Sequence, residues 1–180
     1  MSNTSNITAY FRDVATRHPL ILHSATNKRF FELEWDQMTQ NGAELAFTNW
    51  SLILEDYIEQ PNDNGGDYVS LNMSISFYII KHVPIDDVAA TQAAFEGARQ
   101  ICWDIIAKMK ADEACGEEGC NPDVPAGVTA PRFEDLNQTQ VILVQPPFGD
   151  NPAGARATVR WRTDEEVDMS RDRVAWVPLP

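Results

Sequence analysis

The stretch that decides the fold runs from Val69 to Ile80 and reads VSLNMSISFYII. Every second residue from its start is apolar, and these positions are Val69, Leu71, Met73, Ile75, Phe77 and Ile79. Successive side chains of a β-strand point to opposite faces of the sheet, so this alternation predicts a long strand. Polar residues occupy most of the intervening positions, which indicates that the strand is half buried.

A partner for this strand precedes it along the chain. Residues 50–58 (WSLILEDYI) show the same alternation, with Trp50, Leu52 and Leu54 on one face. Between the two segments, residues 61–67 (PNDNGGD) are dense in residue types that favour turns. Two alternating segments joined by such a turn predict an antiparallel β-hairpin.

The segment after Pro84 predicts the longest helix of the chain, over about residues 86–112. Its apolar stripe follows helical spacing and consists of Val88, Phe95, Ala98, Cys102, Ile105, Ile106 and Met109, with Trp103 beside it. Asp86 or Asp87 is suited to cap the first turn, and lysines near the end suit the negative end of the helix dipole. Because Cys102 lies on the stripe, we expect it to be a small core residue.

A shorter amphipathic helix is predicted over residues 6–17. Its apolar positions are Ile7, Tyr10, Phe11 and Val14. We expect it to end before His18-Pro19, because the residue before a proline disfavours the helical conformation. Residues 23–49 receive no assignment, because Arg29 to Trp35 have a strand-like composition, yet Glu34 to Asn41 could equally form a short helix.

Two further strands are predicted after a long loop over residues 113–135. Residues 139–145 (TQVILVQ) predict a short buried strand. Residues 155–163 predict a strand whose inner face consists of Ala157, Val159 and Trp161. Together the elements predict an α+β fold. We expect a mostly antiparallel four-stranded sheet with the long amphipathic helix packed on one face, an N-terminal helix and an extended C-terminal tail.

The length of 180 residues suits a single domain, which we place at residues 1–166 with a C-terminal extension over 167–180. The formal net charge is −13, and a field of that sign repels phosphate backbones and anionic membranes. We therefore expect neither a membrane partner nor sequence-specific nucleic-acid binding. The polar N-terminus lacks the pattern of a signal peptide, which favours a reducing cytoplasm.

Enzyme signatures are absent from the sequence. It contains no nucleophile elbow, no glycine-rich phosphate loop and no metalloprotease motif, so we expect no catalytic activity and no cofactor. Cys115 and Cys120 have a C-x4-C spacing, but no second ligand pair lies near them in sequence. A local disulfide is the alternative to a metal site, and the sequence does not decide between a disulfide and free thiols.

Two features of the C-terminal part suggest an interface. Arg156, Arg160 and Arg162 are predicted on one strand face, directly before the acidic residues Asp164, Glu165 and Glu166. Arginine and carboxylate groups pair with geometric specificity, either within one chain or between chains. The apolar tail, which includes Trp176 and Leu179, is expected to dock either on its own domain or on a neighbour.

This order of elements resembles the tail terminator and neck-completion proteins of tailed bacteriophages. The resemblance covers about residues 50–165: a hairpin whose second strand is apolar and interleaved with serine, a long helix directly after it, and a final strand like GARATVRWRTDE. It is a resemblance of architecture and includes no diagnostic motif.

The resemblance implies a virion structural protein that is assembled in the host cytoplasm and located at the tail–neck junction. Such a protein forms a homo-oligomeric ring, usually of six subunits, that caps the tail tube and contacts the neck or connector proteins. The arginine row, the acidic segment and the apolar tail would then be interface elements. A different ring component of the neck or tail, or a non-viral small binding module, is the alternative.

Overall fold

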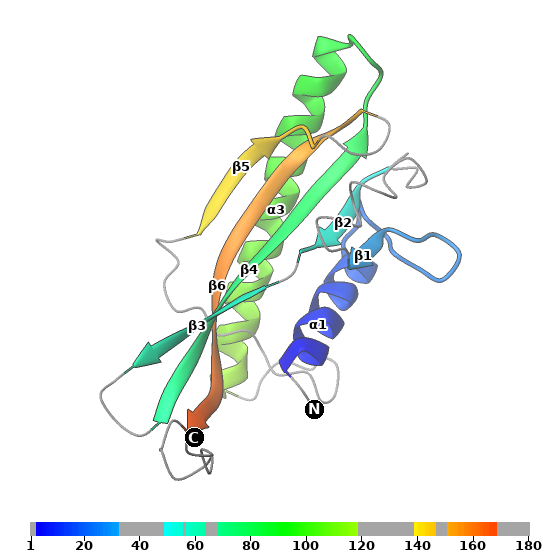
Figure 1. Ribbon diagram of the computed structural model, residues 1–180. Helices are drawn as coiled ribbons and strands as arrows, with labels where there is room; N and C mark the ends of the chain where they lie inside the picture. Colours follow the sequence, from blue (N-terminus) through cyan, green and yellow to red (C-terminus); the bar gives the residue numbers. More distant parts are fainter. Residues whose placement is uncertain are drawn as a thin grey trace, which may run out of the picture.

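The computed structural model describes residues 3–32, 49–55, 57–63, 68–118, 139–146 and 151–168, and only the backbone of residues 3–6, 59–63, 68–71, 115–118 and 162–168. The elements follow in the order α1 (Asn3–Arg17), β1 (Phe30–Glu32), β2 (Ser51–Leu54), β3 (Ile58–Asp63), β4 (Tyr68–His82), α3 (Val88–Glu118), β5 (Gln140–Val144) and β6 (Pro152–Asp168). Figure 1 shows α3 running alongside the long strands and α1 beside β1 and β2.

The described strands form one sheet of six. Five of them follow the order β1-β2-β4-β6-β5, and β3 pairs with β4 outside this path. All pairs are antiparallel except β1–β2, which is parallel. The predicted mixed fold with a mostly antiparallel sheet is confirmed, but the predicted number of four strands was wrong.

One reason for the higher count is a β-bulge in the first arm of the predicted hairpin. β2 and β3 pair with the same edge of β4, since β6 occupies the other edge. From Leu54 to Ile58 this arm advances four residues, whereas β4 advances only three, from Phe77 to Ser74. The extra residue breaks the arm into two strands at Glu55, whose backbone N–H still donates to the carbonyl of Ser76 at 3.0 Å.

The second arm is the predicted long strand, and it is the centre of the sheet. β4 pairs with β6 from Tyr68–Asp168 to His82–Pro152, with one irregularity between Ser70 and Asn72. The predicted turn was placed too early, because Pro61 to Asp63 already belong to β3. Residues 64–67 lie outside the described part of the chain.

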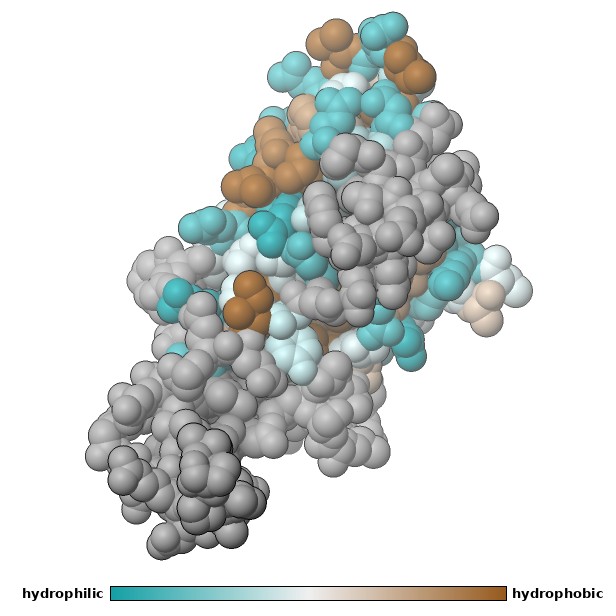
Figure 2. All heavy atoms as spheres, in the orientation of Figure 1, coloured by the Kyte–Doolittle hydropathy of each residue, from teal (hydrophilic) through white to brown (hydrophobic). Residues whose placement is uncertain are grey.

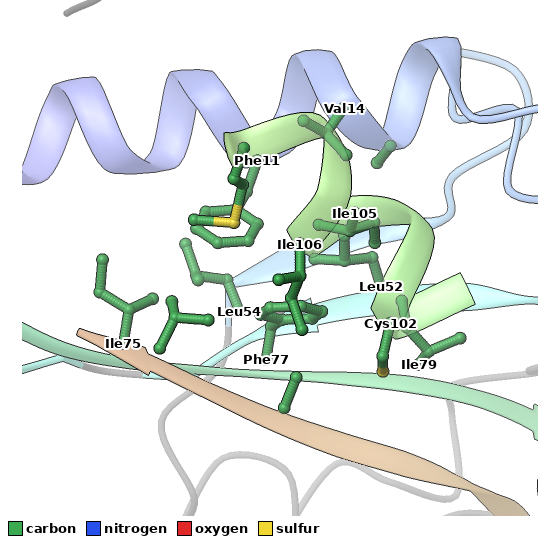
Figure 3. Close-up of a cluster of buried hydrophobic side chains, with 14 of the residues drawn as sticks. Phe11, Val14, Leu52, Leu54, Ile75, Phe77, Ile79, Cys102, Ile105 and Ile106 are labelled. Carbon is green, nitrogen blue, oxygen red and sulfur yellow. The ribbon is translucent and has the colours of Figure 1, made fainter. Parts of the chain in front are cut away.

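The core lies between one face of this sheet and the two helices. Alternate residues of β4 are completely buried there, namely Met73, Ile75, Phe77 and Ile79, as the alternation predicts. They meet the predicted stripe of α1 and the stripe of α3 in one cluster (Figure 3). Burial also raises the pKa of the Cys102 thiol to about 12, which agrees with a small core residue that does not ionise at neutral pH.

α1 and α3 begin and end for identifiable reasons. α1 ends at Arg17, directly before His18-Pro19, as predicted. Asp87 caps α3, because its Oδ1 accepts from the N–H of Ala90 at 2.8 Å. The predicted end of α3 near Asp112 was wrong, since the helix continues to Glu118, at first through Glu113 and Ala114, which favour helix. The predicted stripe was also wrong at Val88, which is exposed in the first turn.

A buried polar contact joins the two helices. The Tyr10 hydroxyl of α1 donates to Asp112 Oδ2 of α3 at 2.8 Å, and Lys108 Nζ lies 2.9 Å from the same carboxylate. Asp112 is only 3% exposed, so the two donors replace the water that its carboxylate loses on folding. The ring of Tyr10 also packs edge-on against Trp161 of β6. The Tyr10 side chain therefore connects α1 with both α3 and the sheet.

We predict that Tyr10→Phe lowers the free energy of unfolding by about 1–3 kcal/mol, because Asp112 then loses a buried hydrogen-bond donor. Urea unfolding followed by circular dichroism measures the change. Lys110→Ala, on the exposed side of α3, is the control and is expected to change stability by less than about 0.5 kcal/mol. Equal free energies of unfolding for Tyr10→Phe and the control would show that the Tyr10–Asp112 hydrogen bond does not stabilise the fold.

A second prediction concerns the close approach of β6 to β4 at Gly154. A Cβ added there would lie 2.9 Å from both the carbonyl carbon of Ile79 and the Cα of Ile80, which are backbone atoms and cannot rotate away. Gly154→Ala is expected to destabilise the protein by about 3 kcal/mol.

Gly97→Ala in α3 is the matched comparison for that variant. Its Cβ would meet the side chain of Trp50, with Cζ2 at 2.6 Å and Cη2 at 3.1 Å, so the indole ring would have to shift, whereas the backbone atoms at Gly154 cannot. Alanine also favours a helix over glycine by about 1 kcal/mol, which offsets part of the cost of that shift. Thermal unfolding should therefore place Gly97→Ala above Gly154→Ala in melting temperature. The reverse order would contradict the tight β4–β6 approach.

Candidate functional site

The first candidate surface is the edge of the sheet formed by β5. Among the described strands β5 pairs only with β6, so it ends the strand path. Ile142 and Leu143 are 48% and 51% exposed, and they point to opposite faces because they are consecutive in a strand. Figure 2 shows a hydrophobic patch at the position that β5 occupies in Figure 1. The prediction of a buried strand at 139–145 was therefore wrong.

This edge lacks the features that usually keep sheet edges from pairing. A strand at an edge presents unpaired N–H and C=O groups, and many proteins protect it with charge or proline. The sequence of β5 is QVILV, without a charge, a proline or a glycine. Two half-exposed aliphatic side chains beside an uncharged edge suit contact with another strand.

The second surface is the sheet face opposite the helices, where the predicted arginine row lies. Arg156 and Arg160 alternate with buried residues of β6, and the register places them opposite Tyr78 and Ser74 of β4. Arg162 follows in the same backbone register, opposite Asn72, but its side chain lies outside the described part of the structure.

Arg156 is held by contacts within its own chain. Its Nε and Nη2 lie 3.1 and 2.7 Å from Glu55 Oε2, and Nη2 also donates to Ser76 Oγ at 3.0 Å. The guanidinium group lies 5.7 Å from the centre of the Tyr78 ring. The β-bulge positions Glu55 for this pair, so Arg156 contributes to the fold as well as to the surface.

The other predicted interface residues are only partly described. Asp164, Glu165 and Glu166 belong to β6, and Glu166 pairs with Ser70 in the backbone register. Their side chains lie outside the description, as do Trp176 and Leu179 in the C-terminal extension. The Cys115 side chain and the whole of Cys120 lie outside it too.

The third surface is a cleft that the sequence did not predict. It has a volume of about 400 Å³ and lies between α1, the loop after it and β1. Its lining includes Arg12, His23, Lys28, Phe31 and Glu32, together with Ser24, Ala25 and Phe30. The run KRFF at 28–31, two bases before two aromatics, was the only local signal for it.

The two cations of this cleft lie over aromatic rings. Arg12 is 5.5 Å from the centre of the Phe30 ring, and Lys28 Nζ is 5.4 Å from the centre of the Phe31 ring. Arg12 also lies 3.5 Å from Glu32, and both side chains are about half exposed at 55% and 45%. Lys28 has no carboxylate within ion-pair distance among the described residues.

The floor of the cleft is built around His23. Its Nδ1 accepts from the backbone N–H groups of Arg29 and Phe30 at 3.0 and 3.2 Å. In a neutral imidazole the other nitrogen then carries the proton, so Nε2 is a donor. Burial, followed by the positive charges of Arg12 and Lys28, lowers the pKa of His23. The ring is therefore neutral at pH 7.

Neither a metal centre nor a membrane span emerges from the described structure. Within the ranges that it covers, no three His, Cys, Asp or Glu side chains lie close enough together to hold a metal ion. Among the same residues, no helix combines the length and the apolar character that crossing a membrane requires. Comparisons with family models, with curated proteins and with solved structures found no match.

We predict a pH dependence of stability that involves His23. Its folded pKa is lowered below the ordinary value of about 6.5, so protonation favours the unfolded chain. The stability from neutral His23 is complete above about pH 6.5 and declines as the pH falls below that value. Burial lowers the pKa of His18 as well, so it contributes in the same direction.

The experiment compares urea unfolding at pH 7 and pH 5 for the parent protein and for His23→Asn. Asparagine can present an acceptor near the position of Nδ1 and does not titrate. We expect the difference in stability between the two pH values to be smaller in the variant. An unchanged difference would show that His23 is not the group responsible.

Proposed function

We propose that this protein is a virion structural protein, a tail terminator that assembles into a ring, caps the tail tube and joins it to the neck. The observation that carries the assembly part of this proposal is the uncharged, apolar edge strand β5 in a chain with a net charge of −13. A charge of that size keeps unrelated surfaces apart by repulsion. Contacts that avoid charge, such as strand pairing along β5, are then the favourable way for copies to meet.

The energetics of this edge suit a specific contact. Pairing would satisfy the outward N–H and C=O groups of β5 with a second backbone. Covering the exposed halves of Ile142 and Leu143 would add roughly 1 kcal/mol for each side chain. Adjacent subunits in a ring use two different surfaces, because a head-to-tail contact closes by rotation. β5 at one end of the strand path and β1 at the other supply two such surfaces.

The assignment to a tail terminator rests on architecture. The elements include an N-terminal helix, an interrupted hairpin, a long helix and a long final strand, in the order expected for that family. A different ring component of the tail or neck would use the same contacts. The cleft favours the alternative, a small binding module, because ligand sites are commonly preformed recesses in which a few polar groups stand among apolar side chains.

The proposal predicts a ring-sized oligomer, measured by size-exclusion chromatography with light scattering, alone or after addition of purified tail tubes. Ile142→Lys places a charge on the β5 edge and is expected to shift the protein to monomer. Since Ile142 is already 48% exposed, the variant should fold with a melting temperature close to that of the parent protein.

Ile85→Lys is the matched control. Ile85 is an aliphatic residue that is 71% exposed, but it lies in the turn before α3 and belongs to no strand. Assembly should survive this substitution. A parent protein that stays monomeric and does not bind tail tubes would refute the proposal. Equal loss of assembly in Ile142→Lys and Ile85→Lys would refute the role of β5.

A further inference from the structure

The cleft between α1 and β1 stands out because of its charge. The chain carries 27 acidic and 14 basic residues, yet two cations line this one recess. Among the described residues of the lining, Glu32 is the only acid, and it lies beside Arg12. Lys28 contacts the face of Phe31 and no carboxylate of the described chain. The described lining, with Arg12 and Lys28 against Glu32, therefore carries a net positive charge.

The recess is preorganised by the loop between α1 and β1. The N–H of His23 donates to the carbonyl of Ala15 at 3.0 Å, and Asn27 Nδ2 donates to the carbonyl of Leu22 at 3.0 Å. Leu22 has a φ of 52°, a left-handed conformation that a leucine adopts only where its surroundings enforce it. A loop fixed in this way holds its charged side chains near their bound positions, which lowers the cost of binding.

The groups in the recess suit a carboxylate. Arg12 presents a planar fork that pairs with both oxygens of a carboxylate, and Lys28 supplies a second positive charge. The neutral His23 contributes an N–H donor without adding a charge. Glu32 shows that a carboxylate fits, because its Oε2 lies 3.5 Å from Arg12 Nη2. That pair is largely exposed and thus weak, so a second carboxylate can compete with it or join it.

We propose that this cleft is a carboxylate-binding site that receives an acidic segment of a second copy of the chain. The inference rests on the proposed assembly and adds to the strand contact at β5 a second, ionic contact at the other end of the strand path. Charge complementarity supports a second copy as the occupant, because the chain as a whole carries 13 excess negative charges and the described lining of the cleft is net positive. Residues of β1 line the cleft, and β1 ends the strand path opposite β5. Figure 1 shows β1 and β5 on opposite sides of the long strands.

The experiment measures self-association of the full chain by analytical ultracentrifugation. Lys28→Glu should weaken association about tenfold or more, because it places an acid where an acid binds. Arg12→Glu should act in the same direction, whereas Lys28→Arg should retain association. Arg12 and Lys28 are exposed, so these variants should fold, and thermal unfolding verifies that they do.

Lys110→Glu is the matched control. It changes the net charge by the same amount as Lys28→Glu but lies on the exposed side of α3. Equal weakening by Lys110→Glu and Lys28→Glu would mean that only total charge matters, which would overturn the proposal. Normal association of Lys28→Glu, together with loss of association in Ile142→Lys, would overturn the cleft contact and leave the assembly intact. A parent protein that remains monomeric would overturn both.

Discussion

The rest of the structure depends on the pairing of β4 with β6. This pair extends from Tyr68–Asp168 to His82–Pro152, and it is held so closely at Gly154 that a side chain has no room there. Both strands turn an apolar face toward α1 and α3, where Phe77 and Ala157 are completely buried. Because each strand of the pair has one edge left, β2 and β3 must share the free edge of β4, and β5 must take that of β6. The exposed position of β5 is thus a consequence of the central pair.

Periodicity made much of this frame predictable. Tyr10 on α1, Met109 on α3 and Ile75 on β4 are buried where the spacing of apolar residues puts them. The features that the sequence did not predict depend on contacts between residues that are far apart in the chain. β1 has only three residues, and its parallel pairing with β2 leaves no local pattern. A bulge of one residue at Glu55 divides a continuous alternation into two strands. An apolar run such as QVILV is the same whether a strand is central or at an edge, so the exposure of Ile142 could not be read from it.

The candidate sites likewise combine features that a local pattern predicts with contacts between residues far apart in the chain. The alternation in β6 correctly separated Arg156 and Arg160 from the buried face, but Arg156 pairs with Glu55, about a hundred residues away in the chain, and only the fold brings them together. The cleft combines Arg12 from α1, His23 from a loop and Lys28 from the approach to β1. In a chain with a net charge of −13, the uncharged edge and the cationic recess are two described surfaces that suit contact with an acidic copy. They belong to opposite ends of the strand path, so they can serve as the two different surfaces that the proposed ring would use.

Hydrogen exchange of the β5 amides tests the proposed assembly through this edge strand most directly. Exchange is followed by mass spectrometry on the full chain at low and at high protein concentration, with peptides that cover Gln140–Val144 and the buried strand β4. Assembly through the edge predicts that the β5 amides become protected as concentration rises, while β4 is protected throughout. Exchange of β5 that stays fast in a sample shown to be oligomeric would contradict it, because the copies would then be joined by another surface.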